Sequence, residues 1–197
     1  MSDPLRSVIV MTERTYHPDC PDCFREVVGL PPENIETTMQ RVDSCVFDHG
    51  WAVQSVLGDN VMPPWAYSIG IWRACRAPEL VVCGAQTSVL TSQINAIGSR
   101  IADGAFFGPG DVLDDVSPAR LYLGPVHPSW RLTTMFAVSV TYYGCPWPPY
   151  LQVVWSDEDG RFPWEPGFRE RFNDLQPMLW IPREEHPPCA WIHIDEL

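Results

Sequence analysis

The sequence predicts an α+β protein in which a central, largely antiparallel (mixed) sheet packs against two or three helices. Strand-like apolar runs cluster in the middle of the chain, short turn-rich connections separate them, and two segments with helical periodicity accompany them. No glycine-rich phosphate loop with its Lys and Ser or Thr follows any of these runs, so a nucleotide-binding parallel sheet is not favoured.

The chain is predicted to have three parts. An N-terminal arm with the Pro-rich turn HPDCPDC covers residues 1–32, a single α+β domain covers residues 33–181, and a Pro-rich C-terminal tail covers residues 182–197. With 45% hydrophobic residues and nine Trp, one domain has ample material for a packed core. No internal repeat or low-complexity linker divides it.

The individual elements follow from hydrophobic spacing and turn signals. Helical spacing predicts one helix over residues 33–49 and a second from Thr87 or Ser88 to Gly104. Residues 129–143 fit the helical and the strand period in part, and a helix is the preferred interpretation. Strands are predicted at residues 7–12, 51–57, 66–72, 79–85, 120–126 and 150–157.

Charge and composition restrict the partners and the compartment. Thirteen basic residues, all of them Arg, oppose 25 acidic residues and give a net charge of -12. The lack of Lys is typical of a GC-rich bacterial genome. The negative charge repels phosphate backbones, so nucleic acid is not expected as a partner. The apolar run around Val8 to Met11 is too short for a signal peptide or a membrane span, so we expect a cytoplasmic protein with no membrane contact.

Several segments together carry a family pattern. They are HGWAVQSV at 49–56, PPWAYSIGI at 63–71, APELVVCG at 77–84, LGPVHPSW at 123–130, LQVVWSDEDGRFPWEPGF at 151–168 and QPMLW at 176–180. The chain resembles, over residues 17–181, the bacterial family called domain of unknown function 4262. Members usually have Pro where this chain has Ser156, a difference that affects a turn more than a site. The resemblance implies a compact bacterial domain and no established activity.

A metal site is predicted in the N-terminal arm. His17, Cys20 and Cys23 form an H-x2-C-x2-C pattern, and two thiolates across a tight turn are a common half of a tetrahedral zinc site. Several members of the family that the chain resembles also carry such a Cys pair. No residue supplies the other half at a diagnostic spacing, so unliganded thiols and a reversible redox pair are the alternatives to zinc.

A catalytic or ligand site is predicted around His127. This His follows a predicted strand, where loops often hold binding groups, and its pKa in water lies near neutrality, which suits a general base. Tyr67 and Glu79 complete the predicted catalytic set, and Glu79 could orient the His or pair with an Arg. The predicted ligand-binding residues are small or aromatic: Ser68, Gly70 and Trp130. The alternative roles are capping or packing for His127, packing for Tyr67, Ser68 and Gly70, and a solvated strand end for Glu79.

Three functional hypotheses follow. The first is a small-molecule-binding or tailoring enzyme with a cleft near Tyr67 and His127. The second is a non-catalytic acidic module, such as an immunity or regulatory protein, that binds a basic protein partner. The third is a metal or thiol-redox protein that uses Cys20 and Cys23. The first is slightly favoured because small, aromatic-rich domains commonly form ligand clefts.

Overall fold

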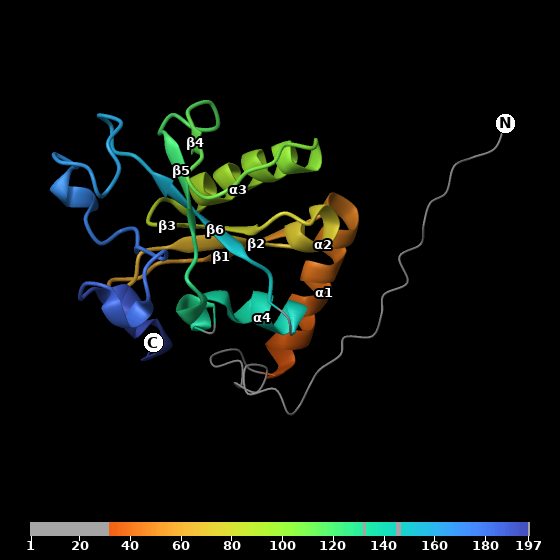
Figure 1. Cartoon of the computed structure of the whole chain (residues 1–197). Helices are drawn as coiled ribbons and strands as arrows, with labels where there is room; N and C mark the ends of the chain where they lie inside the picture. Colours follow the sequence, from red (N-terminus) through yellow and green to blue (C-terminus); the bar gives the residue numbers. More distant parts are fainter. Residues whose placement is uncertain (1–31, 132, 145–146, 197) are drawn as a thin grey trace.

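A computed structural model describes residues 32–131, 133–144 and 147–196. Helices lie on both faces of one six-stranded sheet (Figure 1). The strands are β1 Ala52–Val56, β2 Trp65–Ile69, β3 Glu79–Cys83, β4 Val112–Leu113, β5 Leu121–Pro125 and β6 Tyr150–Trp155. The α-helices are α1 Pro32–His49, α2 Ile71–Cys75, α3 Thr87–Ala102 and α4 Ala137–Tyr143.

The sheet is largely antiparallel, as the sequence predicted. Its strand order is β1-β2-β3-β6-β5-β4. Short connections join β1 to β2 and β2 to β3 in an antiparallel meander, and β5 pairs antiparallel with both β4 and β6. Only β3 and β6 are parallel, because the long segment between them contains α3, β4, β5 and α4 and crosses the sheet. These observations confirm the α+β class with a mixed sheet.

Each face of the sheet has its own hydrophobic core. Leu90, Ile94 and Ile97 of α3 are fully buried and pack on one face against residues such as Leu80 and Leu123. On the other face α1, α4 and the C-terminal segment cover an aromatic-rich core that contains Tyr67, Phe136, Tyr150 and Trp191. The period-2 alternation along β2 produces this division, since Ala66 faces one core and Tyr67 the other.

Two local predictions differ from the structure. Residues 70–72 were expected to continue a strand, but β2 ends at Ile69 and α2 begins at Ile71. Gly70 has a φ of 120° there, and Glu79 accepts hydrogen bonds from the main chain of the turn, a long-range effect that local periodicity does not reveal. The two-residue strand β4 was not predicted because so short an element has no periodicity.

The described residues between Pro128 and Tyr143 form a series of short helices. Two 3-10 helices, η1 Pro128–Trp130 and η2 Thr134–Phe136, precede α4. The helical interpretation of residues 129–143 is therefore correct in type, but the helix is interrupted. Pro128 begins η1, and His127 accepts a hydrogen bond from the amide of Ser129 as its N-cap.

The C-terminal residues, which were expected to form a tail, pack into the core. Trp191 is fully buried and meets the ring of Trp65 edge to face at 5.9 Å between centroids. The amide of Gln152 binds Pro177 O and Leu179 N, at 2.6 and 3.0 Å. The side chain of Gln176 bonds the main chain of Trp155 in the same two-sided way, at 2.9 and 3.0 Å. Side-chain amides therefore hold residues 176–179, which precede the predicted tail of residues 182–197, to the sheet much as a strand ladder would.

None of the helices within residues 32–196 that the structure describes has both the length and the apolar character that crossing a membrane requires.

Candidate functional site

Glu79 is the centre of a buried polar cluster that joins β2, α2, β3 and α4. Its side chain is completely buried at the start of β3. One carboxyl oxygen accepts a hydrogen bond from the Ser68 hydroxyl. The other accepts hydrogen bonds from the amides of Gly70 and Trp72, at 2.9 and 3.0 Å, and from the Tyr143 hydroxyl. We call this set of five residues the Glu79 corner.

The local sequence explains why the corner forms. Gly70 has a positive φ, and a Cβ atom at this position would lie 2.9 Å from the carbonyl oxygen of Gly50, so only glycine fits between β2 and the end of α1. The chain turns at Gly70 and directs its next amides at Glu79. Ser68 is held in place because its Oγ also accepts a hydrogen bond from Leu80 N at 2.8 Å.

Burial controls the protonation of the corner. Removal from water raises the pKa of Glu79 above the ordinary range of a glutamate, while the hydrogen bonds from Ser68 and Tyr143 oppose this shift. Burial, followed by the nearby charge of Glu79, raises the pKa of Tyr143, so its hydroxyl remains a neutral donor. Four donors surround the carboxyl group, three at one oxygen and one at the other. The corner is therefore suited to fixing the backbone rather than to exchanging protons with a substrate.

The predicted catalytic and ligand residues lie in separate places. The structure brings Ser68, Gly70 and Glu79 together. Tyr67 is almost fully buried in the aromatic-rich core against which Tyr143 also packs, and its hydroxyl accepts a hydrogen bond from Val138 N at 3.3 Å rather than joining the corner. Among the described contacts, none joins His127 to Tyr67 or to Glu79.

His127 and Trp130 belong to the turn after β5. The half-buried His127 lies with Nδ1 2.9 Å from Ser129 Oγ. Trp130 is fully buried, and its indole N–H donates to Ile181 O at 2.9 Å, which anchors the C-terminal segment. Trp130 therefore has a packing role in this structure.

The predicted metal ligands His17, Cys20 and Cys23 lie outside the described residues. Within the part of the chain that the structure does describe, no three His, Cys, Asp or Glu side chains lie close enough together to hold a metal ion.

A second candidate site lies at the outer edge of β1. A hollow of about 490 Å³ opens there between α1 and α3. Its lining residues come from three elements and their connections: Cys45, His49, Trp51, Ala52, Val53, Asn95 and Ser99. We call this hollow the β1-edge groove. Cys45 and His49 are one turn apart on α1 and form one wall, whereas Asn95 and Ser99 form the other.

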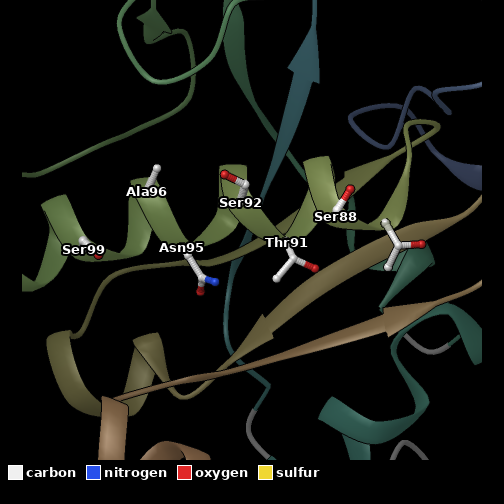
Figure 2. Close-up of a pocket in the computed structure, with 7 residues that line it drawn as sticks. Ser88, Thr91, Ser92, Asn95, Ala96 and Ser99 are labelled. Carbon is white, nitrogen blue, oxygen red and sulfur yellow. The ribbon is translucent and has the colours of Figure 1, made fainter.

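Small polar side chains of α3 extend this groove. Figure 2 shows a shallower hollow along α3 whose lining includes Thr91, Ser92 and Ala96 and shares Asn95 and Ser99 with the groove. Thr91 and Asn95 point toward β1, while Ser92 points away from it. Long side chains are absent from both linings on α3, so the helix leaves space beside the strand.

Two hydrogen bonds fix the groove walls in position. The indole N–H of Trp51 donates to Asn95 Oδ1 at 3.0 Å, and the hydroxyls of Ser55 and Thr91 are 3.1 Å apart. A Cβ atom on Gly98 would lie 3.0 Å from the Trp51 ring, so this glycine permits the ring to lie against α3.

Sequence analysis missed Tyr143 and the residues of the β1-edge groove. The only sequence signal for Asn95 and Ser99 was a polar stripe opposite the apolar stripe of α3, and such a stripe ordinarily indicates a solvated face. Tyr143 gave no signal, because it is 64 residues from Glu79 along the chain.

Comparisons with known proteins give a family but no function. No curated protein and no solved structure matches the chain. One family model matches residues 45–169, more than half of the chain, from the last turn of α1 past the end of β6, and its description is Domain of unknown function (DUF4262). This match agrees with the resemblance carried by the segments from HGWAVQSV to LQVVWSDEDGRFPWEPGF. The chain therefore belongs to the DUF4262 family.

Proposed function

We propose that this protein is a protein-binding module that takes up an extended, basic segment of a partner along the outer edge of β1. One observation carries the proposal: β1 is the terminal strand of the sheet and, within the described residues, pairs with no strand other than β2. The free edge of such a strand can hydrogen-bond to an added strand, which is a common mode of peptide recognition.

The composition of β1 supports this role. Edge strands that are protected against pairing usually carry charged residues, proline or a bulge, or are very short. The sequence Ala-Val-Gln-Ser-Val of β1 contains no charge and no proline, and its five residues pair in regular register with β2. At the opposite edge of the sheet β4 has only two residues. The asymmetry favours β1 as the edge that accepts a partner.

The β1-edge groove supplies room for side chains of the added strand. In a strand, alternate side chains point to opposite faces of the sheet, so a partner would direct one set toward α1 and the other toward α3. The small side chains of Asn95 and Ser99 leave space on the α3 side, and Cys45 and His49 border the α1 side.

Charge supports a basic partner. The chain carries a net charge of -12. Glu36 and Asp48 are exposed on α1, while the guanidinium of Arg41 donates to Gln54 at 2.6 Å beside β1. A segment with alternating Lys or Arg would gain long-range attraction, which mainly raises the rate of association.

The test uses a defined peptide as the probe. A ten-residue peptide of alternating Lys and Val is titrated into the ¹⁵N-labelled protein, and the amide signals of Val53 and Ser55 are followed by NMR. We expect saturable shifts at these amides. A peptide of alternating Glu and Val should bind more weakly, because its charge has the same sign as that of the protein.

Matched variants locate the binding surface. Ser99→Met places a long uncharged side chain in the β1-edge groove and should weaken binding about tenfold, which corresponds to about 1.4 kcal/mol. Ala105→Met places the same side chain at an exposed position beyond the C-terminal end of α3 that lines neither hollow, and should leave binding unchanged. Equal loss of affinity in both variants, or equal binding of the two peptides, would refute the proposal.

A further inference from the structure

Arg131 is a partly buried cation with too few partners. It follows η1, and its Nε atom is buried with no hydrogen-bond partner. Its only hydrogen bond among the described residues is a long one of 3.5 Å from Nη2 to Val126 O. A guanidinium has five N–H donors, and buried donors normally have partners in the protein or in bound water or ions.

Most of the other described arginines have a carboxylate partner, and the three without one within the described residues, Arg41, Arg73 and Arg76, are exposed rather than partly buried. The six that pair with carboxylates within the described residues are Arg100, Arg120, Arg161, Arg169, Arg171 and Arg183. All six pairs form in a chain with 25 acidic residues, yet no described carboxylate lies within 4 Å of Arg131. Burial lowers the pKa of Arg131, which reflects the cost of removing an unpaired cation from water. A bound anion would offset this cost.

His127 adds a second donor at the same turn. Its Nδ1 accepts a hydrogen bond from Ser129 N at 3.3 Å and lies 2.9 Å from Ser129 Oγ, which itself accepts from Arg183 N. Because Nδ1 is an acceptor, the proton of the neutral imidazole resides on Nε2. No described residue accepts a hydrogen bond from this Nε2–H.

We propose that His127 and Arg131 form a binding site for a small oxyanion, either a carboxylate or a phosphate group. The bond from Arg131 to Val126 O folds the guanidinium back beside the residue that precedes His127, so the two free donor groups belong to one turn. Guanidinium and imidazole N–H groups make charge-assisted bonds to such anions. This site is distinct from the β1-edge groove and does not depend on the function proposed for it.

The experiment titrates inorganic phosphate and, separately, acetate into the protein at constant ionic strength. The readouts are the Arg131 Nε–H signal and the His127 ring signals in NMR spectra. Saturable shifts at both residues are the expected result. Saturation by phosphate alone assigns a phosphate group, saturation by acetate alone assigns a carboxylate, and saturation by both assigns a general oxyanion site. A shift that rises linearly with either salt up to high concentration would overturn the proposal.

Variants separate the site from general charge effects. Arg131→Gln should weaken anion binding at least tenfold, and Arg131→Lys should weaken it less because it keeps the charge without the planar donor fork. Arg76→Gln removes an arginine at the end of α2 and should leave the affinity unchanged. If Arg76→Gln weakens binding as much as Arg131→Gln, the site does not exist. The wild-type titration decides the matter if Arg131→Gln fails to fold.

Discussion

The Glu79 corner and the β1-edge groove both contain polar groups from the same antiparallel meander, but they use them in opposite ways. In the corner, four donors from four positions surround one buried carboxyl group. In the groove, the outer edge of β1 pairs with no other strand of the described residues and has small polar neighbours on α3. Satisfied polar groups in the interior specify a single arrangement of the chain, whereas unsatisfied groups at the surface remain available to a partner. The contrast separates the part of this protein that fixes the chain from the part for which we propose a role in recognition.

The largest expected effect comes from removing the centre of the corner. Glu79→Ala leaves the amide of Trp72 and the hydroxyls of Ser68 and Tyr143 without their acceptor, and leaves the amide of Gly70 with the Tyr143 hydroxyl alone. Each buried donor without a partner costs about 1–3 kcal/mol, and the hydroxyls can rotate to other partners, so we expect a total loss of roughly 3–5 kcal/mol. Urea unfolding measures this loss as a change in the free energy of unfolding.

Glu79→Gln keeps the shape of the side chain but cannot ionise. The pH dependence of the free energy of unfolding therefore distinguishes this variant from the wild type. Because the pKa of Glu79 is raised by folding, the folded protein holds this proton more tightly than the unfolded chain does. The resulting stability is present below the unfolded pKa of about 4.3 and is lost as the pH rises through the folded pKa. The stability of the wild type relative to Glu79→Gln should therefore fall as the pH increases above this value. If the stability of the wild type relative to Glu79→Gln rose with pH, the hydrogen bonds to Glu79 would lower its pKa by more than burial raises it.

An intermediate effect is expected for Tyr143→Phe. The change removes one donor to Glu79 and the acceptor that the Tyr143 hydroxyl offers to Gly70 N at 2.8 Å. We expect a loss of about 1–2 kcal/mol in thermal or urea unfolding. Tyr122→Phe is the matched control, because Tyr122 contacts the rings of Phe162 and Trp164 and its hydroxyl makes no hydrogen bond within the described residues. An equal loss in both variants would mean that the corner adds nothing beyond an ordinary buried hydroxyl.

The smallest effect is expected at the groove. Thr91→Val removes the hydrogen bond to Ser55 but keeps the shape of the side chain, and should cost about 0.5–1 kcal/mol because both hydroxyls are only partly buried. Thr87→Val on the same helix is the control, since its hydroxyl makes no hydrogen bond within the described residues. Unfolding in urea compares the two. A loss at Thr91 as large as that of Tyr143→Phe would remove the distinction between the corner and the groove.

Local patterns predicted the elements that local physics determines. The helices α1 and α3 each carry an apolar stripe at helical spacing, and the strands β1, β3, β5 and β6 are apolar runs between turn residues, so their existence followed from the sequence. The antiparallel meander followed from the short connections. By contrast, α2 has only five residues and depends on Glu79, seven or more positions along the chain, so its sequence alone resembled the continuation of a strand.

The candidate site was predictable only in part, for the same reason. Ser68, Gly70 and Glu79 were chosen from adjacent strands, and antiparallel pairing does bring them together. Tyr143 reaches the corner through the packing of α4 on the sheet, which no spacing encodes. His127 was predicted as a general base in one catalytic set with Tyr67 and Glu79, but the turn after β5 places it one turn from Arg131. The role of its ring depends on Ser129 and on the unpaired Arg131, which only the folded chain reveals.

The C-terminal segment shows that the part of the chain matched by the family model is shorter than the part that forms the hydrophobic core. The family match ends at residue 169. Leu179, Trp191 and Ile194 lie beyond that residue, yet all three belong to the core that covers one face of the sheet. A recombinant fragment designed from the family boundaries would lack these side chains and would expose the edge of Trp65 and the amide of Gln152 to water. The border of the recognisable family thus runs through the middle of a hydrophobic core.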